Sequence, residues 1–105
     1  MTTSTLVPRA IAIHEFEPLV GRTILVDCTP RIAELTLVEV KPLRQHPDSD
    51  RIPFSLLFRS STAILLGSGT YAMRSGDFGP ELIFITPVNA PMGGAPGHYY
   101  EAVFN

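Results

Sequence analysis

Tryptophan is absent from this 105-residue sequence, and cysteine and lysine occur once each. Cys28 therefore has no second thiol for a disulfide or a thiolate metal site, and we expect it to fill core space. No apolar run approaches the roughly 20 residues of a membrane helix. The first residues lack a basic segment followed by an apolar one, so no signal peptide is predicted. We expect a cytoplasmic protein, exported only as part of a larger assembly.

Positive charge is also sparse, with eight basic residues against ten acidic ones and a net charge of −2. The basic residues are scattered singly, which is not the electrostatic footprint of a phosphate-binding surface, so no nucleic-acid partner is expected. His14, His46 and His98 are far apart in the sequence and show no spacing typical of a metal site. The sequence predicts neither a metal nor a cofactor.

Catalytic signatures are missing as well. The serines and threonines lie in no strand-turn-helix elbow, and nothing pairs two of the ten carboxylates as acid and base. Gly67 and Gly69 do not extend to a dinucleotide- or phosphate-binding loop, because neither a helix nor a phosphate-binding lysine follows them. The sequence therefore predicts that the protein is not an enzyme and has no catalytic or cofactor-binding residues.

Eight glycines and ten prolines cut the chain into short apolar runs and leave little room for long helices. The runs are rich in β-branched and aromatic residues, as strands require. The predicted strands are 22–28, 32–41, 54–59, 63–66, 70–74, 82–87 and 99–104. We expect an all-β fold: a single compact antiparallel β-sandwich or small barrel of about seven to eight strands, with at most one short helical turn.

Several local features refine this outline. The apolar parity changes within 35–41, and a bulge near Leu37 would restore a single inward face. Residues 14–20 form either a helical turn or a strand, because Phe16, Leu19 and Val20 fall at helical spacing. The segments 43–51 and 89–97 are expected loops. We divide the chain into an N-terminal arm, 1–13, and a single β domain, 14–105. Within the arm, the apolar and threonine-rich segment 6–13 is able to add a strand to a neighbour's edge.

Two apolar runs, 63–66 and 82–85, have no polar residue in alternate positions. Such strands need cover on both faces, and a small antiparallel domain has few ways to cover its outer faces from within. We therefore expect one outer face to pack on another molecule. Tyrosines add flat amphipathic surface that suits interfaces. The predicted partner-binding residues are Tyr71, Tyr99, Tyr100, Leu82, Ile83, Phe84 and Ile85.

Arg59 and Glu101 are oppositely charged residues for which we favour a structural role over a catalytic one. Arg59 ends one apolar strand and Glu101 interrupts another. If these strands are neighbours, the two side chains could form a buried salt link, and the sequence does not decide whether they meet. Such a link fixes the register of the strands and takes no part in catalysis.

Five segments resemble a family of uncharacterised small bacterial β-proteins, a domain of unknown function. They are Phe-Glu-Pro-Leu-Val-Gly at 16–21, residues 35–40, 53–59 and 69–71, and the closing Tyr-Glu-Ala-Val-Phe-Asn at 100–105, so the resemblance spans nearly the whole chain. It implies a gene near those of phage-tail-collar-like proteins and a role beside tail-fibre-like or filamentous assemblies. It carries over no catalytic residue.

Two functional hypotheses follow from these observations. The first is a non-enzymatic structural or interaction module that forms a homo-oligomer or packs on a tail-fibre-like or filamentous partner. The alternative is a small-ligand or carbohydrate-binding module, with the loop 89–97 and its neighbouring tyrosines as a shallow site. The absence of tryptophan disfavours the second hypothesis, because sugar sites commonly use aromatic faces. Neither hypothesis involves nucleic acid or a membrane.

Overall fold

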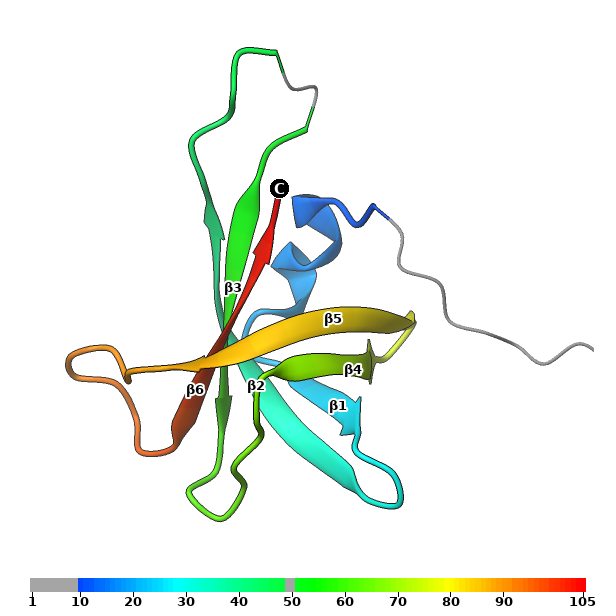
Figure 1. The fold of residues 1–105 in the computed structure, drawn as a ribbon, viewed down its shortest axis with the longest axis vertical. Helices are drawn as coiled ribbons and strands as arrows, with labels where there is room; N and C mark the ends of the chain where they lie inside the picture. Colours follow the sequence, from blue (N-terminus) through cyan, green and yellow to red (C-terminus); the bar gives the residue numbers. More distant parts are fainter. Residues whose placement is uncertain (1–9, 49–50) are drawn as a thin grey trace, which may run out of the picture.

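Six antiparallel strands close into a barrel in the computed structural model, which describes residues 10–48 and 51–105. The strands are β1 (Thr23–Asp27), β2 (Ile32–Pro42), β3 (Phe54–Ser60), β4 (Gly69–Ser75), β5 (Phe78–Val88) and β6 (His98–Phe104). Around the barrel they follow the order β1, β2, β3, β6, β5, β4 (Figure 1). The predicted all-β fold is confirmed, as a small barrel with slightly fewer strands than expected.

Alternating side chains build the core. In β3, Phe54, Leu56 and Phe58 are buried, while the residues between them are half-buried, as expected for a strand with one face inward. The predicted inward face of this strand is confirmed.

Cys28, which was predicted to fill core space, is only half-buried and packs against the edge of the core.

The run 63–66 is not a strand, and this prediction was wrong. It belongs to the connection between β3 and β4, where Ile64 N–H donates to Ser61 O at 3.2 Å and Ser60 Oγ donates to Ile64 O at 2.9 Å. These bonds close a tight turn that carries Leu66 into the core and leaves Leu65 71% exposed. Leu66 belongs to the core and Ile64 packs against it, so the run 63–66 is partly buried without being covered on both faces.

The bulge predicted near Leu37 is confirmed. The register between β2 and β3 shifts between Leu37 and Glu39, so that Val38 is the extra residue. Leu37 is fully buried and Val40 packs against the core, whereas Val38 is exposed. The bulge therefore keeps both halves of β2 facing the same interior.

Residues 13–19 form two consecutive 3₁₀ helices, Ile13–Glu15 and Glu17–Leu19, and no strand. Glu15 Oε2 accepts the Ala12 N–H at 2.9 Å and so satisfies a backbone donor at the start of the first helix. Ile11 is 2% exposed and belongs to the core. The predicted strand addition by 6–13 lies largely outside the described residues, which begin at Ala10.

Phe16, between the two 3₁₀ helices, seals one end of the barrel. β5 pairs with β6 only from Thr86 to Val88, so the two strands separate towards the start of β5 and the end of β6. Phe16 lies among Phe54, Phe78 and Phe104, with ring centroids 5.0 to 5.8 Å from its own. Figure 1 shows the helical segment beside the C-terminal end of β6. This aromatic cluster replaces the missing strand pairing with apolar contact.

We expect Tyr100→Phe to lower the free energy of unfolding by about 1–3 kcal/mol. The buried Tyr100 hydroxyl lies 3.0 Å from Ser60 Oγ and accepts the Leu66 N–H at 3.1 Å. Removing the hydroxyl leaves the Leu66 amide without that partner in the core, which is the costly case for a hydrogen bond. Urea denaturation followed by circular dichroism measures the loss.

Tyr71→Phe is the matched control. The Tyr71 hydroxyl also donates to a backbone oxygen, Gly67 O at 2.9 Å, but this bond is exposed to water. The expected change is below about 0.5 kcal/mol. If both variants lost the same stability, burial of the Leu66 amide would not explain the effect.

Candidate functional site

The predicted partner-binding residues divide into a buried and an accessible group. Ile83, Ile85, Tyr99 and Tyr100 are each at most 3% exposed. Phe84 is 58% exposed, and Leu82 and Tyr71 are half-buried. β5 alternates in the usual way despite its continuous apolar sequence, so the chain itself covers one face of the strand and not the other. The prediction of partner binding is therefore concentrated on Phe84.

The Tyr99 and Tyr100 side chains are both buried, on opposite faces of β6. Tyr100 points into the barrel, whereas Tyr99 is buried beneath the loop 89–97 and donates its hydroxyl to Ala95 O at 2.7 Å. Gly94 packs so closely on this ring that an added Cβ would lie 2.8 Å from the Tyr99 hydroxyl oxygen. The shallow sugar site suggested for this loop therefore has no accessible ring at Tyr99 on which a sugar could stack.

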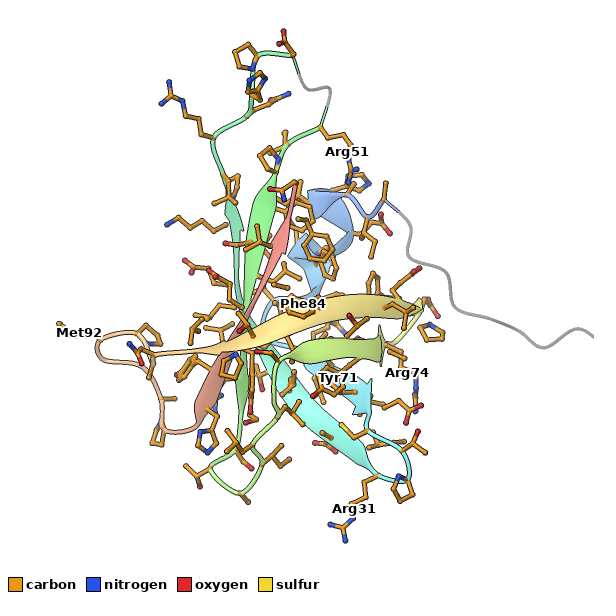
Figure 2. All side chains as sticks on the ribbon, in the orientation of Figure 1. Arg31, Arg51, Tyr71, Arg74, Phe84 and Met92 are labelled. Atoms are coloured by element: carbon orange, nitrogen blue, oxygen red, sulfur yellow. The ribbon has the colours of Figure 1, made fainter. Side chains whose placement is uncertain are left out.

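Outward-facing apolar side chains also occur on β6 and β3, where β5 and β6 have begun to separate. Thr86 pairs with Glu101, and Phe84 and Val103 lie two residues beyond that pair on their strands, on the same outer face. Val103 is 52% exposed. Figure 2 shows Phe84 on β5 near the centre of the molecule. We call Phe84, Val103 and the half-buried Leu82 the outer apolar cluster.

An open hollow of about 370 Å³ adjoins the outer apolar cluster at Val103. Its apolar lining includes Leu57 of β3 and Val88 of β5, and its charged lining consists of Glu39, Lys41 and Glu101. Sequence reasoning missed Val103 and Leu57. The alternation of residues 99–104 and 54–59 was the available signal, because it places both side chains opposite the buried positions.

The other exposed large apolar side chains among the described residues are not part of the outer apolar cluster. They are Val20, Ile32, Val38, Ile52, Leu65 and Met92. Leu65 and Met92 lie in connections between strands, and Met92 is at the tip of the loop 89–97 (Figure 2). Single exposed apolar residues are normal on a protein surface, so these residues define no further site.

The strands of Arg59 and Glu101 are neighbours, as the salt-link interpretation required. Arg59 pairs with Tyr99, however, and Glu101 with Leu57. No ion pair joins Arg59 to Glu101 in the described structure, and both side chains are half-buried on the outer face. The suggested buried salt link is not formed: the two charges lie on a diagonal of the ladder and not directly opposite each other, and neither side chain is fully buried.

A second hollow, of about 250 Å³, lies at the end of β1 and is lined by Asp27, Thr29, Ile32 and Arg74 among others. The Thr29 N–H and hydroxyl donate to Asp27 Oδ1 at 3.0 and 2.9 Å. These two bonds, with a smaller contribution from the charge of Arg74, hold the pKa of Asp27 below its ordinary value. The carboxylate is thus a stable negative charge at this turn.

Groups suited to metal binding do not gather in the described part of the chain, where no three His, Cys, Asp or Glu side chains lie together. His46 and Asp48 meet in the exposed connection after β2, with His46 Nδ1 3.9 Å from Asp48 Oδ2. The Asp48 N–H also donates to His46 Nδ1 at 3.2 Å. No helix among the described residues is long and apolar enough to cross a membrane.

Residues 11–104 match the model of a family described as a domain of unknown function, DUF6916. The chain belongs to this family. The DUF6916 match runs from buried Ile11 to the last residue of β6 and so includes the 3₁₀ helices and all six strands. The expected membership in an uncharacterised family is confirmed, and the match names no function. No curated protein and no solved structure matches the chain significantly.

We expect Thr29→Val to raise the pKa of Asp27 part of the way to its ordinary value. The substitution removes the hydroxyl bond, but the backbone N–H of residue 29, the larger cause of the shift, remains. A carbon-detected NMR titration of the carboxyl group measures the change. An unchanged pKa in the variant would contradict the assignment of the hydroxyl bond.

The lowered pKa of Asp27 also gives the direction in which its contribution to folding stability changes with pH. The folded pKa of Asp27 lies below its ordinary value, so the stabilisation that its ionised form contributes is present above the ordinary pKa. It is lost as the pH falls through the folded pKa.

Proposed function

We propose that this protein is a non-enzymatic structural module that assembles with further copies of itself through the outer face of β5 and β6. The observation that carries the proposal is the outer apolar cluster, in which Phe84 and Val103 are both more than half exposed on adjacent strands. The proposal agrees with the absence of catalytic motifs from the sequence.

The energetics favour covering this face. Complete burial of one phenylalanine side chain contributes about 1.5–3 kcal/mol, and Phe84 leaves 58% of its surface in water. Leu82 is half-buried two residues from Phe84 on β5, and Leu57 is half-buried in the hollow that adjoins Val103. Glu101 and Lys41 at the margin supply the polar rim that surrounds the apolar centre of many interfaces.

The setting of this assembly is the finer part of the proposal. We propose a tail-fibre-like or filamentous assembly, on the basis of the resemblance given by residues 16–21, 53–59 and 100–105. The protein is made in the cytoplasm and leaves it only within such a particle. Small barrels are suitable building blocks for this purpose, because closure leaves few strand edges for uncontrolled aggregation.

We expect Phe84→Ser to weaken self-association by about ten- to hundredfold, which is the loss expected from exposing a buried phenyl group. The average mass in solution, measured by light scattering across a concentration series, should fall. Stability should change little, because Phe84 is exposed in the monomer.

Leu65→Ser is the matched control, since Leu65 is 71% exposed but lies in the connection between β3 and β4. It should assemble like the unaltered protein. Equal loss of assembly in both variants would point to general surface hydrophobicity. Unchanged assembly after Phe84→Ser would overturn the role given to the outer apolar cluster.

A further inference from the structure

The second half of β2 has an edge that no strand occupies in the part of the chain described. β1 pairs with β2 only from Ile32 to Thr36, and two more backbone bonds connect Leu37 to residues 21 and 22. Beyond the bulge, β2 pairs with β3 alone. Figure 1 shows this end of β2 on the outside of the molecule, with β3 next to it.

The hydrogen-bonding groups of this edge can be assigned from the ladder. Leu43 N–H donates to Pro53 O at 2.8 Å, one position after the last β2–β3 pair. Residues of an antiparallel strand alternate between bonding to one neighbour and pointing away from it. Glu39 and Lys41 therefore bond to β3, and Val40 directs its N–H and C=O to the open edge. Such a pair of groups is a template for another strand.

We infer that this edge pairs with the same edge of a second copy, antiparallel about a two-fold axis at Val40. The inference rests on the proposed self-association and adds a second interface to it. Each Val40 N–H donates to Val40 C=O of the other copy, as in a hydrogen-bonded antiparallel pair. Glu39 then lies directly opposite Lys41 of the other copy, on both sides of the axis. Opposite charges in this position stabilise strand pairing.

The charges also select this register. Moving the axis to Lys41 would place two lysines opposite each other, and moving it to Glu39 would place two glutamates opposite each other. Like charges directly across a strand pair are destabilising. A two-fold axis at Val40 is therefore the arrangement in which both charges of each copy face an opposite charge.

The ends of the segment limit the pairing to a dimer. The bulge at Val38 ends regular pairing on one side, and Pro42, the last residue of β2, has no N–H to donate on the other. Bulges, lysine and proline are features that restrict edge pairing in natural proteins. Here they leave a short stretch centred on Val40, which suits a closed two-fold contact and not a continuous stack of strands.

The paired edge would also join the outer faces of the two copies. β6, β3 and β2 of one copy would continue into the same strands of the other, making one six-stranded sheet. On its outer face the residues in line would be Glu101, Leu57 and Glu39 of one copy, followed by Lys41, Ser55 and Val103 of the other. The hollows beside Val103 thus become parts of one continuous surface.

The test uses the full chain carrying Phe84→Ser, which weakens the contact through the outer apolar cluster so that the edge makes the larger contribution. Sedimentation velocity up to about 1 mM covers the range of a weak dimer. We expect this protein to dimerise. Adding either Glu39→Lys or Lys41→Glu places like charges opposite each other at both pairs and should weaken the dimer roughly tenfold.

Restoring the charge pattern is the decisive measurement. Combining Glu39→Lys with Lys41→Glu returns opposite charges to both pairs, so the dimer should regain its original strength. Mixing the two single variants should give a mixed dimer that is tighter than either homodimer. Glu34→Lys and Arg31→Glu are matched controls, because both residues are exposed and lie away from the edge. They should leave the dimer unchanged.

The outcomes separate this inference from the proposed function. If the Phe84→Ser protein is monomeric throughout while the unaltered protein assembles, the edge dimer is overturned and the proposed self-association stands. Equal dimer strength in the charge variants also overturns the edge. A monomeric unaltered protein overturns both. If deleting residues 2–9 abolishes the dimer, the N-terminal arm occupies the edge and the second copy's β2 does not.

Discussion

The barrel depends on the fact that β2 and β5, each 11 residues long, are longer than the strands beside them. One strand cannot keep the same two neighbours over its whole length when those neighbours are shorter. β2 pairs with β1 over its first half only, and β5 pairs with β4 before it meets β6 at its end. These changes of partner allow six strands to close with two bulges and without a long flat sheet.

Changing partners leaves strand pairing incomplete in several places, and two of them differ in how they are covered. Between the start of β5 and the end of β6, Phe16 packs against Phe78 and Phe104, so aromatic contact closes the barrel. Beyond Leu37, the outer edge of β2 has no such cover among the described residues. The first contributes to stability, and the second is the edge that we infer to pair with a second copy.

The accessible surfaces of this barrel lie on its outside. Its interior is occupied by core side chains, including Tyr100, whose hydroxyl contacts Ser60 and Leu66. Tyr99 is used to hold the loop 89–97. The surface that remains apolar and accessible is formed by side chains that alternate with the core positions on β5 and β6, chiefly Phe84 and Val103. An assembly module needs only such a surface, and no constellation of reactive groups.

Local patterns in the sequence determined the strand at 54–59, the bulge at Leu37 and the all-β class, because period-two alternation acts within a few residues. They did not distinguish the turn at 63–66 from the strand at 82–85, since both are uniformly apolar. Tertiary structure alone decided that Tyr99 lies under a loop, that Arg59 and Glu101 are not directly opposite, and that no strand among the described residues pairs with the outer edge of β2 beyond Leu37. These depend on which strands become neighbours and at what offset, a choice made by contacts between residues distant in sequence.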